Sequence, residues 1–232
     1  MRGSVKSAGR ASSRAPARAP QPTVSSLLAA LPDLVLGALF LLTWVAPTAI
    51  REKMVAYLVL LMLLEFIIVH SSAFMGSVMV SAADRRKKSL AILGLGAFYT
   101  LFVGGFAIAF KALWLLWNFW GLTLNRLLGV LIGQAPAGNE KEFVMRGWAV
   151  STMCYLLFAF ATTLLPFPAL GVTHEIAQRQ ALPGDGLWID APHRAIAFGF
   201  LYFTTVGVSE LFHHAWLPAG TQGAARSGGT AE

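Results

Sequence analysis

The feature that most constrains this chain is a run of thirty residues, from Met54 to Ala83, without a single Lys, Arg or Asp. One acid, Glu65, interrupts the run, and leucine, isoleucine and phenylalanine surround it. About 20 consecutive apolar residues are enough for a helix to cross the hydrocarbon core of a bilayer. The run therefore predicts a membrane-spanning helix with one carboxyl group near its middle.

The composition extends this prediction to the whole chain. Hydrophobic residues make up 56% of the sequence and charged residues 12%, whereas a soluble domain carries about 25% charged residues. A chain of 232 residues with several spans has no room for a separate soluble domain. We predict an all-α, polytopic transmembrane helical bundle, formed as a single domain by residues 25–218. Disordered tails are expected at 1–24 and 219–232, where small, polar and basic residues cannot form a core.

The hydropathy pattern predicts about six spanning helices. We place them at about residues 31–50, 54–82, 89–110, 111–133, 147–165 and 193–214. Pro32 and Asp33 suit a first helical turn, so the first span is expected to begin there. Asp190 is expected to cap the last span, just before Pro192. Small residues in the third span should allow close packing of a neighbouring helix: Gly94, Ala97, Gly104, Gly105 and Ala109.

The segment 111–133 allows two interpretations. Lys111, Asn118 and Asn125 recur every seven residues, so they would form a narrow polar stripe on a helix. We favour a span whose stripe faces the bundle. The alternative is an amphipathic helix in the membrane interface, with its tryptophans at headgroup level.

Basic residues are distributed unevenly along the chain. Five of the 18 Lys and Arg lie in the first twenty residues, and four more form the run Arg85–Lys88, which consists of Arg85, Arg86, Lys87 and Lys88. The positive-inside rule then places both termini in the cytoplasm. We expect these clusters to contact anionic lipid rather than nucleic acid, in a bacterial-type plasma (inner) membrane. A cleaved signal peptide or an organellar transit peptide is the alternative explanation of the N-terminal tail.

The first candidate site is an intramembrane polar cluster of Glu65, His70, Ser72 and Asn118. A carboxylate at the bilayer centre is disfavoured by about 3 kcal/mol, so it needs a buried partner or a function. The functional hypothesis is a site that handles protons or a polar substrate. The structural hypothesis is a neutral glutamic acid that is hydrogen-bonded to Asn118, Thr162 or Thr163.

The second candidate is a metal site formed by Glu210, His213 and His214, which would share one side of a helix. Di-iron bundles use such Glu-x-x-His units in pairs with further carboxylates, whereas this chain has one unit. The loop before the last span also contains ligand-type side chains, but without a zinc-site spacing: His174, Glu175, Asp185, Asp190 and His193. No complete motif implies a cofactor.

These observations predict a non-enzymatic membrane protein, either a small conduit or carrier or an accessory subunit. Its partners would be the lipid bilayer and another membrane protein or a second copy of the chain. A membrane-embedded metalloenzyme that uses Glu210, His213 and His214 is the competing hypothesis. A scaffold without a substrate, in which polar residues only fix the helix register, is the third.

Overall fold

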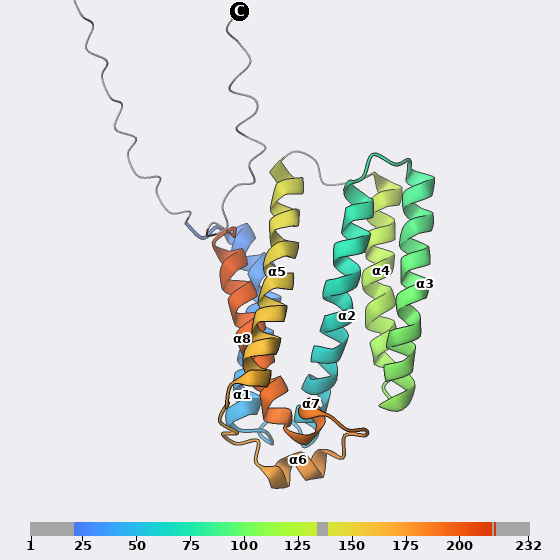
Figure 1. Cartoon of the computed structure of the whole chain (residues 1–232). Helices are drawn as coiled ribbons and strands as arrows, with labels where there is room; N and C mark the ends of the chain where they lie inside the picture. The colour runs from blue at the N-terminus through green and yellow to red at the C-terminus, as the bar shows by residue number, and fades with distance from the viewer. Residues whose placement is uncertain (1–20, 134–138, 215, 217–232) are drawn as a thin grey trace, which may run out of the picture.

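The computed structural model describes residues 21–133, 139–214 and 216, which form eight helices and no strand (Figure 1). The helices are α1 (Val24–Val45), α2 (Met54–Val80), α3 (Arg85–Ala109), α4 (Trp114–Ile132), α5 (Asn139–Leu164), α6 (His174–Gln180), α7 (Leu187–Asp190) and α8 (Pro192–Leu211). Five of them, α1 to α5, are long and apolar enough to cross a membrane. The prediction of an all-helical bundle with several helices suited to crossing a membrane is therefore confirmed for the described residues. The two expected tails lie almost wholly outside the described residues.

Helix α8, predicted as the sixth span, lies in the bundle beside α1 and α5 but is not among the five (Figure 1). Its sequence is less apolar because it includes Arg194, Glu210 and several hydroxyl residues. Neighbouring helices cover it along most of its length, as the full burial of Ala195 and Phe198 shows. A helix shielded by protein needs less apolar surface than one that faces lipid. The count of six spans stays a prediction.

Helix α2 lies between two packing clusters, and Figure 1 shows it between α5 and α8 on one side and the α3–α4 pair on the other. The first cluster joins α2 to α1, α5 and α8 through residues such as Phe40, Val59 and Phe198. The second joins α2 to α3 and α4 through residues such as Leu64 and Phe119. Burial on both sides explains why α2 is apolar around its whole circumference.

The predicted start of the first span is wrong, because α1 begins seven residues earlier, at Val24. Thr23 and Ser26 form a capping box there, in which each side chain accepts a hydrogen bond from the backbone N–H of the other. Pro32 lies inside the helix, where its ring removes one backbone hydrogen bond. The cap and the packing of α1 on α8 offset that loss.

The predicted cap of the last helix is also wrong. Ala191 precedes α8 without any side-chain hydrogen bond, and Asp190 is instead the last residue of α7. Pro192 does occupy the start of α8, where a missing N–H costs nothing.

The break between α3 and α4 occurs at Lys111, without a Gly or Pro. Lys111 has a φ of 52°, in the left-handed region, and the N–H of Ala112 donates to the carbonyl of Ala107 at 2.8 Å. The turn lets α4 return alongside α3, as Figure 1 shows, and α4 is one of the five candidate spans. This arrangement supports the spanning interpretation over the interfacial one.

The polar stripe of α4 does not face the bundle, so that prediction is wrong. Asn118 and Asn125 are exposed on the outside of α4, and Lys111 is exposed in the turn before it. The opposite face packs on its neighbours instead, and its buried residues are Leu115, Phe119, Thr123 and Val130.

The positions of the third helix that were predicted to pack closely do not do so, whereas Gly96 and Ala107 of the same helix are buried. Gly94, Gly104 and Gly105 have no neighbouring atom within 4 Å of the position that a Cβ would take. The close approach occurs between α1 and α8, where a Cβ on Gly37 would lie 2.5 Å from the hydroxyl of Thr204. Small residues therefore permit close helix packing in this bundle, but at positions other than those predicted.

The start of α1, the end of α8 and the basic run Arg85–Lys88 at the start of α3 lie at the same end of the bundle (Figure 1). The predicted topology, with both termini and the basic run on one side of the membrane, requires these three segments to share one end of the bundle.

Candidate functional site

Glu65 lies near the middle of α2, and a tyrosine of α8 binds it. The hydroxyl of Tyr202 donates a hydrogen bond of 2.8 Å to Oε1 of Glu65. The expected partners do not take part: Asn118 is exposed, and the hydroxyl of Thr162 donates to the carbonyl of Phe158 in its own helix. Tyr202 therefore satisfies the carboxyl group that the sequence places at bilayer depth.

Aromatic packing fixes the direction of the Tyr202 hydroxyl. Tyr202 is only 2% exposed, and its ring lies edge-on to that of Tyr155 from α5, with centroids 5.5 Å apart. The hydroxyl of Tyr155 donates to the carbonyl of Met62 in α2 at 3.0 Å. The two phenols thus tie α5 and α8 to α2, close to Glu65.

A cation approaches the same region from α4. The guanidinium of Arg126 donates to the hydroxyl of Ser72 and, at 3.3 Å, to the sulfur of Met75. The positive charge of Arg126 also interacts electrostatically with the carboxyl group of Glu65. Every ion pair in the described part of the chain joins residues of one helix or its cap, at Asp84–Lys87, Glu142–Arg146 and Glu175–Arg179. Arg126, which belongs to a candidate span, therefore has no carboxylate within 4 Å among the described residues.

A second carboxyl group, Asp33 of α1, acts electrostatically on Glu65 and also interacts with Glu210. The register of the two helices accounts for the second interaction, because a Cβ on Gly207 would meet Leu34. Asp33 and Glu210 thus lie toward the end of the bundle where α1 begins. Among the described residues, Asp33 is partly buried and makes no hydrogen bond or ion pair.

Two of the four predicted polar residues belong to this network. Ser72 joins it through Arg126, and its hydroxyl donates to the carbonyl of Ile68 at 2.5 Å. His70 does not join it, because its Nδ1 donates to the carbonyl of Phe66 at 2.8 Å. Asn118 lies on the exposed face of α4.

The sequence does not single out Asp33, Tyr202 or Arg126 as site residues, and the first two have ordinary structural explanations. Asp33 fitted a helix start, and Tyr202 is an ordinary aromatic residue of an apolar helix. Arg126 carried a usable signal, since a charge inside a span most often faces the bundle interior.

The predicted metal site does not form on one helix face. α8 ends at Leu211, and His213 and His214 both adopt left-handed backbone conformations, with φ of 54° and 52°. The N–H of His214 donates to the carbonyl of Ser209 at 2.8 Å, which turns the chain out of the helix. The i, i+3 and i+4 spacing from Glu210 is therefore not realised.

Within the described ranges, no three His, Cys, Asp or Glu side chains lie close enough to hold one metal ion. The ligand-type residues of the loop have local contacts instead: His174 contacts Gln178 at 2.9 Å, and Glu175 pairs with Arg179, all within α6. The geometry gives the metalloenzyme hypothesis no support.

His214 is buried just beyond the end of α8 and contacts Ser209. The indole N–H of Trp216 donates to the hydroxyl oxygen of Ser209 at 2.6 Å, so the Ser209 hydroxyl can donate to Nδ1 of His214, 2.9 Å away. Burial, with smaller contributions from His213 and Arg146, lowers the pKa of His214.

This environment predicts an acid-sensitive helix end. Because the folded state depresses the pKa of His214 below its ordinary value of about 6.5, the residue stabilises the fold fully above that pH. The contribution is lost as the pH falls through the folded-state pKa. We expect the free energy of unfolding in detergent to fall as the pH drops below about 6.5, and His214→Gln to reduce that slope. An equal slope in both proteins would contradict the prediction.

No protein-family model, curated protein or solved structure matches the chain. The functional argument therefore rests on the fold and on the geometry of the site.

Proposed function

We propose that the protein is a small membrane conduit or carrier that moves protons, or a solute together with protons, by way of Glu65. The observation that carries the proposal is the hydrogen bond from Tyr202 to Glu65, with Asp33 and Arg126 acting on the same carboxyl group. These residues come from α1, α2, α4 and α8. Ionisable side chains inside spans are rare, and they commonly mark ion or proton pathways.

The distribution of these groups supports access from one side. Asp33, Glu210 and Arg126 all lie between Glu65 and the end of the bundle where α1 begins. The other half of α2, from Met54 to Leu64, is apolar except for one tyrosine. Protons would reach Glu65 from the side that carries the basic run Arg85–Lys88. The positive-inside rule makes that side cytoplasmic, in a bacterial-type inner membrane whose anionic lipids the basic run would contact.

The test is a proton-flux measurement on the purified protein in liposomes. A pH gradient is imposed, and a trapped pH-sensitive dye reports the flux per protein. Glu65→Gln keeps the shape of the side chain but cannot exchange a proton, so we expect the flux to fall at least tenfold. Glu175→Gln removes an acid that is 73% exposed in α6, and it should leave the flux unchanged.

Equal flux from the wild type and Glu65→Gln, or no flux from either, would contradict the proposal. The second candidate function is a scaffold, favoured by the fact that Tyr202 already satisfies Glu65 within the bundle. Glu65→Leu separates the two functions, because a scaffold would tolerate it with unchanged phenotype and equal or greater stability, whereas a carrier would lose activity.

A further inference from the structure

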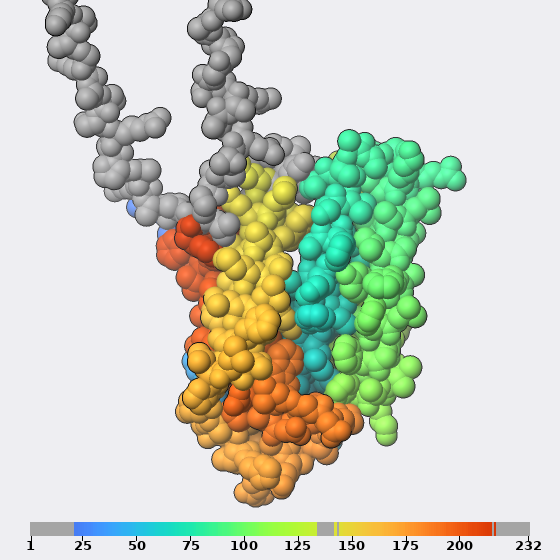
Figure 2. Space-filling view, in the orientation of Figure 1, coloured from blue at the N-terminus to red at the C-terminus, as the bar shows by residue number. Residues whose placement is uncertain are grey.

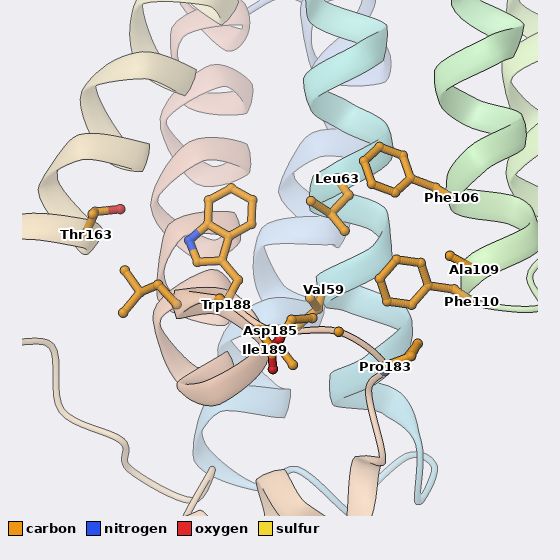
Figure 3. Close-up of a pocket in the computed structure, with 13 residues that line it drawn as sticks. Val59, Leu63, Phe106, Ala109, Phe110, Thr163, Pro183, Asp185, Trp188 and Ile189 are labelled. Carbon is orange, nitrogen blue, oxygen red and sulfur yellow. The ribbon is translucent and has the colours of Figure 1, made fainter.

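A cleft of about 560 Å³ lies between α2, the end of α3 and the segment around α7 (Figure 3). Its walls are formed by Leu63, Phe106, Phe110 and Trp188, with Thr163 of α5 at its edge. In Figure 3 the indole of Trp188 stands between the helix that carries Thr163 and the helix that carries Leu63. Apart from Thr163 and the loop before α7, the lining is apolar.

A second cavity of about 360 Å³ continues from this cleft between α2 and α5. Leu63, Thr163 and Trp188 line both cavities, so the two form one slot. The second cavity extends to Phe66 and Tyr155, and it adds no charged side chain. Combined volumes in this range and walls of this kind are typical of sites that bind small apolar ligands.

The position of the slot identifies the kind of occupant. It lies beside candidate spans, and Figure 2 shows the α7 segment across the lower end of this side of the molecule, between α5 and α3. Where α2, α3 and α5 cross a bilayer, the solvent outside the slot is hydrocarbon rather than water. A hydrocarbon chain of a lipid can enter such an apolar slot at little cost, because neither the chain nor the apolar wall of the slot has polar groups that must give up contacts with water.

One charged side chain lines the slot in the described part of the chain, the carboxylate of Asp185. It is exposed and belongs to the loop 183–186, at the end of the bundle opposite the start of α1. An anionic side chain at the mouth of an apolar slot favours a headgroup that donates hydrogen bonds and carries a positive charge.

We propose that this slot binds one phospholipid of the surrounding bilayer, with a hydrocarbon chain between α2 and α5 and a primary-amine headgroup at Asp185. The site goes beyond the proton-carrier proposal and does not depend on Glu65. It lies in the membrane half opposite the basic run, so it is separate from the expected contacts with anionic lipid.

Two alanines of α3 provide a matched pair of variants. Ala109 lines the cleft and is exposed, whereas Ala97 is exposed on the same helix and lies outside the lining. Ala109→Trp should fill the cleft, while Ala97→Trp adds the same side chain elsewhere. Native mass spectrometry of delipidated, full-length protein, titrated with phosphatidylethanolamine or phosphatidylglycerol, gives the dissociation constant of each lipid. Thermal unfolding confirms that both variants fold.

We expect phosphatidylethanolamine to bind the wild type and Ala97→Trp with equal affinity, and Ala109→Trp at least tenfold more weakly. Asp185→Asn, which cannot disturb the apolar walls, should remove the preference for phosphatidylethanolamine over phosphatidylglycerol. Equal binding by the two tryptophan variants would overturn the site. A wild-type preference for phosphatidylglycerol, or a lipid preference unaffected by Asp185→Asn, would overturn the headgroup assignment.

Discussion

Gly76→Leu is expected to lower the free energy of unfolding by about 3 kcal/mol, because it overpacks a helix contact with no free space. Gly76 of α2 is buried against the indole of Trp148 from α5, and a Cβ at this position would overlap the six-membered ring. In lipid, helices associate through close packing and gain little from hydrophobic burial, so a lost contact between α2 and α5 is not replaced. Unfolding in mixed micelles, followed by far-ultraviolet circular dichroism, measures the change.

Gly94→Leu is the matched control for this substitution. It makes the same chemical change inside α3, where no atom lies within 4 Å of the new Cβ. Its effect should stay within about 0.5 kcal/mol. A second variant tests the cause: Trp148→Ala introduced into Gly76→Leu should recover part of the loss. Equal losses in the two glycine variants would show that the overlap with Trp148 does not limit stability.

Phe40→Ala should destabilise the fold by about 3 kcal/mol through the cavity that it leaves. The Phe40 side chain is fully buried between α1 and α8, and its ring stacks on that of Phe203 with centroids 5.5 Å apart. It also fills the space beside Gly199, where any Cβ would overlap the Phe40 ring. Removing the ring therefore leaves both helices without their central contact.

Phe74→Ala is the matched control, because it makes the same substitution at an exposed position. Phe74 of α2 is 55% exposed and faces the surroundings of the bundle. Lipid can occupy the space that its ring vacates, so the same unfolding measurement should show a change of less than about 1 kcal/mol. A loss equal to that of Phe40→Ala would contradict the assignment of the α1–α8 contact as a main source of stability.

The sequence predicts a helix well where hydrophobicity alone determines it. It does not predict the helix ends that depend on local hydrogen bonds and backbone conformation. α2 was placed at 54–82 and runs from Met54 to Val80, because a long uncharged stretch has one stable form in a bilayer. The start of α1 depends on the capping box at Thr23, and the α3–α4 turn depends on a left-handed Lys111. Neither of these features has a hydropathy signal.

The candidate site was predictable only in part, for a related reason. Glu65 is conspicuous because one acid in an apolar run is costly wherever the helix packs. Its partner Tyr202 lies 137 positions away along the chain, and only the packing of α2 on α8 brings the two together. His70 and Asn118 were chosen because they are polar residues in spans, but the rotation of each helix about its axis decides which side chains meet.

The central place of α2 links the mechanics of the bundle to its electrostatics. The α3–α4 hairpin packs chiefly on α2, and Arg126 reaches Ser72 across that single interface. The contribution of Arg126 to the electrostatic potential at Glu65 consequently depends on the position of this hairpin against α2. A tilt of α3 and α4 would therefore change the proton affinity of Glu65 on α2, even if no residue in contact with Glu65 moved.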